Sequence, residues 1–302
     1  MKYHPTIIAG GGWAGLAAAV ELSQRNIPVT VFESAKQLGG RARSLPTENT
    51  LLDNGQHLMI GAYSQMQSLL NTIGVNTREA FLQIPQQLEM LDLNSREKVF
   101  ELKLPRLPTP LHLLVGMLQC PSLSFKQKLQ TLLRFNRLLN QELEQDMSVD
   151  DWLNSAGLPE AYTEYLLKPL CLAALTTHTH EASARAFQTV LQQTFNGPAS
   201  NTDLLIPATD LGNIFPAAAK HYIESKGGQV LTEHRVSQLN LAQDKVESIT
   251  VNDQRVEVEQ LILATPPPVT QKLLTGIPAC DDITQQLSRL DYEPVTTVYL
   301  QY

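Results

Sequence analysis

Three glycines near the start of the chain have the spacing of a phosphate-binding turn. Gly10, Gly12 and Gly15 follow the apolar segment 6–9 and precede a stretch with helical character. The first glycine permits a tight turn, the second lets the backbone approach a pyrophosphate, and the third lets the helix pack closely against the sheet. Free N–H groups at the start of that helix favour an anion. The spacing therefore predicts a bound dinucleotide.

A carboxylate stands where the ribose of such a dinucleotide would lie. Residues 28–33 are typical of a second parallel strand, and Glu33 ends it. An acidic side chain at this point accepts hydrogen bonds from the ribose hydroxyls, and it disfavours a 2′-phosphate. A glycine-rich turn in an ordinary α/β unit would explain the glycines, but it does not account for Glu33.

One βαβ unit positions these residues, with a helix expected over residues 14–25. After Glu33 the chain does not continue with the strand and helix repeats of an NAD-dependent domain, because residues 63–201 are mostly helical and leucine-rich. Four later segments are typical of strands: 229–232, 235–239, 246–251 and 260–265. The last is apolar and is followed by three prolines, so we expect it to rejoin the parallel sheet.

We therefore expect an α/β fold with a discontinuous, Rossmann-like domain built from residues 1–62 and 202–268. Residues 63–201 and 269–302 are expected to form a second, substrate-binding domain of helices and mixed sheet. Residues 295–302 are rich in β-branched and aromatic side chains, which predicts a strand without its partners. We expect the chain to be truncated at its C-terminus and the second domain to be incomplete.

Composition argues against several other classes of protein. The 302 residues carry a net charge of −7 without a basic block, whereas binding to nucleic-acid phosphates needs clustered Lys and Arg. Cys120, Cys171 and Cys280 are widely separated, so they predict neither a disulfide framework nor a zinc site. No apolar run reaches the roughly 18 residues of a membrane span, and the N-terminus leaves no room for a signal peptide. We expect a cytoplasmic protein.

His178 and His180 raise the question of a metal site. Two residues apart, they would lie on different sides of a helix, and no third ligand of fitting spacing follows. We expect solvated histidines and no bound metal.

Residues 125–139 form a locally basic, amphipathic segment. Its apolar and basic side chains are Phe125, Leu129, Leu132, Leu133 and Phe135, and Lys126, Lys128, Arg134 and Arg137. Together with residues 111–118, the segment could lie on an anionic membrane surface and admit a lipid. A helix that packs its apolar face inside the protein explains the same pattern, so both interpretations stay open.

Further motifs make the chain similar to a known superfamily. Gly39-Gly40-Arg41 and the later Asp53-Asn54-Gly55-Gln56-His57 resemble motifs of the FAD-dependent amine oxidase and phytoene desaturase superfamily. Within it, the chain is most similar to the hydroxysqualene dehydroxylases, or squalene-associated FAD-dependent desaturases. The short sequence motifs that carry this resemblance are residues 10–19, 53–57, 169–175 and 181–185. The superfamily's second flavin motif, a Gly-Asp pair near the C-terminus, has no counterpart after Thr265, in line with the expected truncation.

The resemblance implies FAD as the cofactor and gives roles to the matching positions. The implied FAD-binding residues are Gly10, Gly12, Trp13, Ala14, Gly15, Glu33, Gly40, Arg41 and Val236. Arg41 or Arg43 would offset the charge of the pyrophosphate, since a guanidinium is always charged and offers a fork of donors. Solvated arginines are the alternative. The main chain of Val236 would pair with the adenine edge, whereas an ordinary core valine is its alternative interpretation.

Asp53 and His57 are the implied catalytic candidates, as donors to a leaving hydroxyl. Turn formation explains the same residues, because Asp-Asn-Gly is favourable turn chemistry. The implied activity is reductive dehydroxylation of hydroxysqualene to squalene and water in hopanoid synthesis, with hydride from reduced FAD. A phytoene-type carotenoid desaturase is the alternative, and a noncatalytic escort protein that binds prenyl lipids is the alternative of another class.

The implied partners are a long isoprenoid substrate, an unidentified reductant for the flavin, and the inner face of the membrane as a peripheral contact. Leucine-rich helices suit either polyisoprene, so composition does not choose between them.

Overall fold

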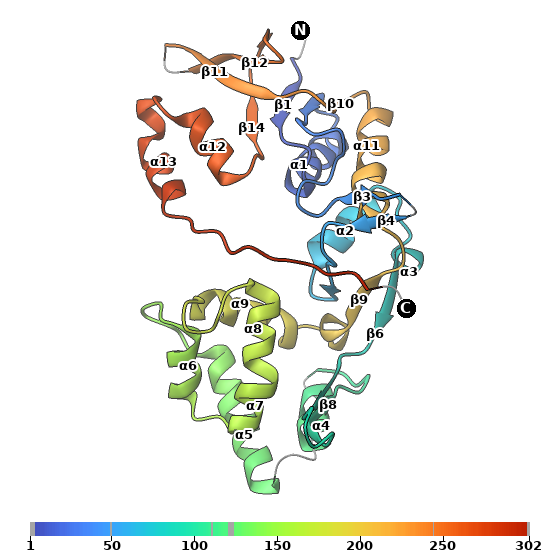
Figure 1. Ribbon diagram of the computed structural model, residues 1–302, viewed down its shortest axis with the longest axis vertical. Helices are drawn as coiled ribbons and strands as arrows, with labels where there is room; N and C mark the ends of the chain where they lie inside the picture. The colour runs from blue at the N-terminus through green and yellow to red at the C-terminus, as the bar shows by residue number, and fades with distance from the viewer. Residues whose placement is uncertain (1–3, 49, 110, 120–123, 244, 301–302) are drawn as a thin grey trace. The chain divides into compact units, whose positions relative to one another are not determined.

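The computed structural model describes residues 4–48, 50–109, 111–119, 124–243 and 245–300 (Figure 1). The chain divides into two compact units. Unit 1 contains Met1–His57, Gln65–Phe81 and Pro207–Tyr302, and unit 2 contains Leu58–Ser64 and Leu82–Ile206. A discontinuous unit of this kind requires strands from distant parts of the sequence to pair with one another.

A four-stranded parallel sheet lies at the centre of unit 1, in the order β10-β2-β1-β14. Its strands are β10 (Gln229–Leu231), β2 (Val29–Phe32), β1 (Thr6–Ala9) and β14 (Leu261–Leu263). All residues of β1 and β2 are buried, as expected for short apolar strands of a parallel sheet. The predicted α/β fold with a Rossmann-like parallel sheet is confirmed. Strand β14 joins it from far along the chain, as Ala9 pairs with Leu263, 254 positions later.

Helix α1 (Trp13–Gln24) connects β1 to β2 and completes the βαβ unit. Its buried residues include Gly15, Leu16, Ala19 and Val20, which recur at helical spacing. The remaining elements of unit 1 before residue 229 are β3 (Ser44–Pro46), β4 (Leu51–Asp53), α2 (Ser64–Thr72), α3 (Thr77–Ala80), α10 (Leu211–Ile214) and α11 (Pro216–Ser225). Helix α11 ends at Ser225, two residues before Gly227, whose φ of +83° suits glycine after a helix.

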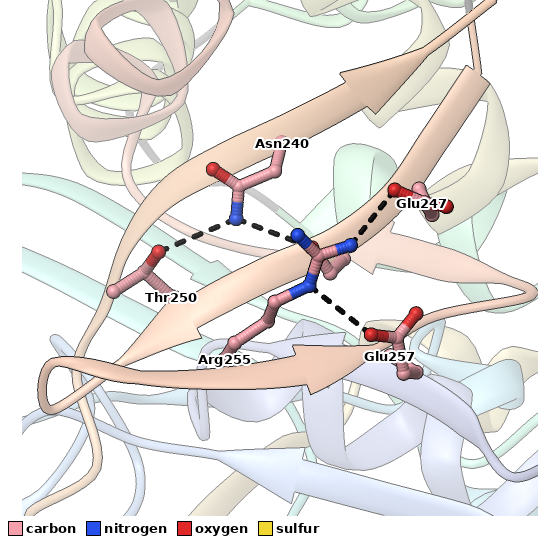
Figure 2. A network of polar contacts seen from close by, with 6 residues as sticks. Asn240, Glu247, Thr250, Arg255 and Glu257 are labelled. Carbon is pink, nitrogen blue, oxygen red and sulfur yellow. Dashed lines mark hydrogen bonds and ion pairs between the residues drawn. The ribbon is translucent and has the colours of Figure 1, made fainter.

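An antiparallel sheet of three strands follows: β11 (Val236–Ala242), β12 (Lys245–Val251) and β13 (Gln254–Glu257). Polar pairs cross its exposed face (Figure 2), where Arg255 contacts Glu247 at 2.8 Å and Glu257 at 3.1 Å. Asn240 donates to the Thr250 hydroxyl at 3.4 Å. The two ion pairs of Arg255 are solvent-exposed, so they contribute little to the stability of the unit.

Residues 269–302, which we expected in the substrate domain, lie in unit 1. After β14 come α12 (Pro267–Leu274), the 3-10 turn Pro278–Cys280 and α13 (Asp281–Ser288). Leu273, Leu274 and Ile277 are buried in one cluster with β1, β11 and β12. The apolar side of α12 therefore ties this segment to the two sheets of unit 1.

The strand predicted over residues 295–302 is wrong for its described part. Residues 291–300 have no regular secondary structure, and residues 301–302 lie outside the described residues. Strand propensity depends on packing against a neighbouring strand. Within the described part of this segment, the Tyr299 hydroxyl donates to the carbonyl oxygen of Asp53 at 2.9 Å.

Unit 2 is mainly helical, and its helices pack around a large apolar cluster. Its helices are α4 (Leu111–Gln119), α5 (Phe125–Asn140), α6 (Val149–Ala156), α7 (Glu160–Tyr162), α8 (Lys168–Leu175) and α9 (Ala184–Phe195), with the 3-10 turn Ala199–Thr202 after them. Large side chains are fully buried in this cluster, among them Phe100, Trp152 and Phe187, each 0% exposed. A small sheet in the order β5-β9-β6 is built from β5 (Met59–Ile60), β9 (Leu204–Pro207) and β6 (Phe81–Ile84).

A hairpin of β7 (Gln87–Leu91) and β8 (Lys98–Lys103) interrupts the segment that we expected to be mostly helical. Burial alternates along both strands, with Phe100 and Leu102 facing the core. The Asp92 carboxylate accepts hydrogen bonds from the backbone of Asn94 and Ser95, both at 2.8 Å, and closes the turn. These hydrogen bonds lower the pKa of Asp92. The Asp-x-Asn-Ser turn was the signal that could have revealed the hairpin.

A π-helical turn, Thr163–Leu167, joins α7 to α8. Pro169 stands at the start of α8 and has no N–H to donate to the preceding turn. The Lys168 N–H bonds to the Thr163 carbonyl instead, which widens the helix locally. Pro169, the first residue of the 169–175 motif, thus has a structural role, because it accounts for the widened turn before α8.

The buried His112 makes the stability of unit 2 dependent on pH. It is 1% exposed, and neither ring nitrogen has a hydrogen-bond partner among the residues that the structure describes, so burial lowers the pKa of its imidazole. The unfolded chain therefore binds a proton more readily than the folded one. The free energy of unfolding keeps the full contribution of the neutral imidazole above about pH 6.5, which is the pKa of a histidine in the unfolded chain. Below that pH the free energy of unfolding falls, by at most about 1.4 kcal/mol per pH unit.

We predict that His112→Leu removes this part of the pH dependence, because leucine cannot take up a proton and leaves no unpaired polar atom buried. Urea unfolding at several pH values between 5 and 8, followed by tryptophan fluorescence, measures the effect. His221→Leu is the control, since His221 is exposed on α11. An equal loss of stability at acid pH in wild type and His112→Leu would contradict the prediction.

Candidate cofactor site

The turn between β1 and α1 requires glycine at two positions for reasons of packing alone. Gly10 has a φ of +113°, and a Cβ atom there would lie 2.5 Å from the carbonyl oxygen of Ala264 on the neighbouring strand. A Cβ atom on Gly15 would lie 2.0 Å from the carbonyl oxygen of Gly10. The helix therefore begins in direct contact with the end of β1, which places its N-terminus at the carboxyl edge of the sheet.

Gly12 differs from these two glycines. Its φ is −73°, and a Cβ atom there would meet only the Cα of Gly40, at 3.8 Å, which is ordinary contact. The fold by itself does not exclude a side chain at Gly12. An open position between two glycine-rich loops fits a ligand whose phosphates approach the backbone closely.

A second loop lies directly beside this turn. The Gly39 N–H donates to the Gly11 carbonyl at 2.9 Å, and Gly12 and Gly39 form an isolated parallel bridge. Gly40 has a φ of +60°. The two glycine segments are thus joined through main-chain contacts, which brings Gly40 and Arg41 to the dinucleotide turn.

The N-terminus of α1 has no side-chain cap. Five other helices of the described chain, α3, α5, α6, α9 and α10, are capped by Asn76, Ser124, Ser148, Ser183 and Asp210 respectively. Among the described residues, no side chain caps the first turn of α1, so the N-terminus of this helix is open to an anion. Trp13 itself is fixed, because its indole N–H donates to the Ala42 carbonyl at 2.9 Å and its ring lies 4.9 Å from that of Phe215.

Glu33 is buried at the end of β2, and its carboxylate orders the backbone around it. Oε2 accepts the Gly11 N–H at 2.6 Å, while Oε1 accepts the Ala35 N–H at 2.7 Å and the Ser34 hydroxyl at 3.2 Å. Oε2 keeps a second acceptor position, which can take a ribose hydroxyl. Glu33 therefore links the glycine turn to the expected position of the ribose.

Val236 lies at the start of β11, two residues after a backbone contact with Glu33. The backbone of the preceding segment reaches β2, since the His234 N–H donates to the Glu33 carbonyl at 2.8 Å. The Val236 side chain belongs to the apolar cluster of unit 1, as in the core interpretation. β11 is an edge strand of its sheet, and the pairing of its main chain with adenine stays a prediction.

Asn54 shapes the loop that carries both arginines. Its N–H donates to the Arg43 carbonyl and its side-chain amide to the Arg41 carbonyl, each at 2.8 Å. The Arg41 side chain is exposed, whereas Arg43 is half-buried and its Nε has no hydrogen-bond partner. The sequence analysis missed this role of Asn54, although the residue stands within the quoted Asp53–His57 motif.

Asp53 takes part in a hydrogen-bond network that sequence reasoning also missed. Its Oδ1 lies 2.8 Å from the Ser44 hydroxyl and accepts the Leu211 N–H at 3.0 Å. The same hydroxyl lies 2.8 Å from Oδ1 of Asp210, which caps α10. Burial opposes the charge on Asp210, but hydrogen bonds from Ser44 and Asn213 outweigh it, so the pKa of this carboxyl is lowered.

His57 lies after this network on an exposed turn. Its Nδ1 is 2.8 Å from the Gly55 carbonyl, so the ring is oriented with Nε2 directed away from that contact. The structure therefore gives Asp53 a scaffolding role in unit 1 and leaves a nitrogen of His57 available. The catalytic assignment of both residues stays a prediction.

His178 and His180 do not lie on a helix, contrary to the expected placement. They belong to the turn after α8, with ring centroids 5.7 Å apart. Among the residues that the structure describes, no three His, Cys, Asp or Glu side chains gather to hold a metal. Cys120 lies outside the described residues, and burial raises the pKa of the Cys171 thiol to about 11. No described helix is long and apolar enough to cross a membrane.

The glycine turn, the uncapped helix and the buried carboxylate define a dinucleotide-binding protein of the βαβ class. The model of the flavin-containing amine oxidoreductase family matches residues 13–302. The chain belongs to this family, and its cofactor is FAD.

Two curated relatives and one solved structure illustrate the similarity. A hydroxysqualene dehydroxylase of Sinorhizobium fredii is 27% identical over 89% of this chain and 63% of its own length. A 15-cis-phytoene desaturase of Capsicum annuum is 23% identical over 98% of this chain and 52% of its own length. An oxidoreductase from Methanosarcina mazei shares the fold, with a TM-score of 0.73 and 16% identity. The match covers 95% of this chain and 65% of the oxidoreductase. The chain thus spans less than two thirds of these relatives.

The two glycines Gly12 and Gly15 offer a matched test of the cofactor site. We predict that Gly12→Ala leaves the thermal midpoint of the FAD-free protein within a few degrees, because the new methyl meets no protein atom closely. The same methyl occupies space that the pyrophosphate needs, so the affinity for FAD falls about tenfold or more. Flavin fluorescence titration and thermal unfolding measure the two effects.

Gly15→Ala is the counterpart variant. Its methyl collides with the Gly10 carbonyl, so the thermal midpoint falls whether FAD is present or not. A Gly12→Ala protein with unchanged FAD affinity would contradict the assignment of the phosphate site.

Proposed function

We propose that the protein catalyses the reductive dehydroxylation of hydroxysqualene to squalene with FAD as its cofactor. The observation that carries this proposal is the similarity to hydroxysqualene dehydroxylases over about nine tenths of the chain, joined to an FAD turn with all its parts. Two such relatives are 27% identical to the chain. The phytoene desaturases match at similar distance, so desaturation of phytoene is the competing candidate.

The reaction must break the carbon–oxygen bond of the substrate and replace it with a carbon–hydrogen bond. The oxygen leaves as water after taking up one proton, and the carbon receives a hydride. Bound, reduced FAD supplies this hydride. The protein has to hold the cofactor, deliver a proton to the leaving oxygen, exclude water and hold a long apolar chain.

In this proposal unit 1 holds the cofactor. The N-terminus of α1 and either Arg41 or Arg43 bind the pyrophosphate. Glu33 accepts hydrogen bonds from the ribose hydroxyls. His57 in its imidazolium form is the proposed proton donor, because Nδ1–H donates to the Gly55 carbonyl and the second proton, on Nε2, is the one given to the leaving oxygen, which leaves a neutral imidazole. Asp53 positions this segment through Ser44 and Leu211.

Unit 2 supplies apolar surface for an isoprenoid chain. An open pocket of about 590 Å³ lies between β6, the segment after β8 and the 3-10 turn Ala199–Thr202. Its lining is mixed, with apolar groups from Leu104, Pro105, Leu107, Pro108 and Ala199 and polar groups from Gln83, Arg106, Ser200, Thr202 and Asp203. Ligand pockets combine apolar walls with a few polar groups, and we propose that an isoprenoid chain binds here.

The activity is tested with the complete protein, under anaerobic conditions, with FAD, a chemical reductant and hydroxysqualene. We predict formation of squalene that requires both FAD and the reductant, measured by mass spectrometry of the lipid extract. A parallel incubation with phytoene and oxidised FAD is the control. Untouched hydroxysqualene together with a more unsaturated product from phytoene would replace the proposal by a desaturase, and a protein that binds prenyl lipid but no FAD would replace it by an escort.

We predict that His57→Gln lowers kcat for squalene formation about a hundredfold, the usual scale for loss of a proton donor. FAD affinity and the thermal midpoint should stay unchanged, because the side chain is exposed and bonds only to its own turn. His221→Gln, on the exposed side of α11, is the matched control. Unchanged turnover and an unchanged pH profile in His57→Gln would remove His57 from the mechanism.

A further inference from the structure

Helix α5 is fixed to unit 2 by one of its faces. Thr131, Phe135, Leu138 and Leu139 are at most 3% exposed, and the three apolar residues belong to the core cluster of unit 2. Ser124 and Gln127 form a capping box at its N-terminus. The buried face of α5 therefore anchors the helix, and the other side is not needed for its packing.

That opposite side carries an apolar row that the described chain leaves uncovered. Phe125, Leu129 and Leu133 are 76%, 52% and 70% exposed. A spacing of four residues places them one above another along the helix. We call this row the exposed stripe. Single exposed apolar residues are ordinary, but an aligned row of three on one helix needs a reason.

Basic side chains border the exposed stripe. Lys126 and Arg137 are exposed, fall beside the stripe on the helical projection, and make no hydrogen bond or ion pair through their side chains within the described residues. The other two cations of α5 are occupied, since Lys128 donates to the Leu118 carbonyl and Arg134 to the Gly157 carbonyl. No acidic residue occurs in α5, although the whole chain has a net charge of −7.

We propose that the exposed stripe docks on an anionic phospholipid bilayer. The helix would lie in the plane of the membrane, with Phe125, Leu129 and Leu133 at the boundary of headgroups and acyl chains. Lys126 and Arg137 would contact the lipid phosphates. This combination of an apolar row and bordering cations is typical of interfacial helices.

Charge also argues against a second copy of the chain as the occupant. In a two-fold symmetric dimer the same surface faces itself. Two copies of α5 would then bring Lys126 and Arg137 towards their own equivalents without any acidic residue of the helix to offset them. An anionic bilayer matches both the apolar and the charged part of the surface. This inference does not depend on the identity of the substrate.

The test is flotation of the complete, FAD-loaded protein with vesicles of phosphatidylglycerol and phosphatidylcholine, compared with vesicles of phosphatidylcholine alone. We expect binding to the anionic vesicles that weakens as salt is added. The triple variant F125S/L129S/L133S and the double variant K126E/R137E should each reduce this binding about tenfold or more. Circular dichroism checks that both variants are folded, as expected for changes to exposed side chains.

The matched control is L82S/L91S/L93S, which removes three leucines that are 59%, 56% and 91% exposed on β6 and the β7–β8 hairpin. It should bind anionic vesicles as the wild type does. Equal binding to both kinds of vesicle, or unchanged binding of the two α5 variants, would overturn the proposal. A dimer that F125S/L129S/L133S dissociates, without vesicle binding by the wild type, would assign the stripe to a second copy instead.

Discussion

The close contact between α1 and the end of β1 is the constraint on which the cofactor site depends. No Cβ atom fits between Gly15 and the Gly10 carbonyl, which a methyl would approach to 2.0 Å. Because of this contact, the helix starts at the carboxyl edge of the sheet with its first N–H groups uncapped. Residues from other parts of the chain then complete the site. Glu33 bonds to Gly11, and the 39–40 loop bonds to the same residue.

Much of this arrangement follows from local sequence. The glycine spacing, the acidic end of the second strand and the later strand segments each predict their own element, and the structure forms them as β1, α1, β2, β10, β11, β12 and β14. Short buried strands and a tight turn are encoded by neighbouring residues, so a single sequence reveals them. The family match adds the cofactor to this framework.

Other features depend on contacts between distant residues, which local patterns do not contain. The Ser44 hydroxyl meets Asp210 across 166 positions of sequence, and no motif marks that pair in advance. The placement of residues 269–290 in unit 1 depends on whether α12 finds an apolar surface there. Residues 291–300 show the converse, since their strand-like composition forms no strand. The β7–β8 hairpin was overlooked although its turn is local, because the leucine content of the segment suggested helices.

The binding of the FAD pyrophosphate at the start of α1 is the interaction on which the proposed function rests. A crystal structure of the FAD complex tests this most directly. We predict phosphate oxygens within hydrogen-bond distance of the first-turn N–H groups of α1, near Gly12 and Gly40, and a ribose hydroxyl on the carboxylate of Glu33. A complex in which these N–H groups face solvent and the pyrophosphate binds elsewhere in the chain would contradict it.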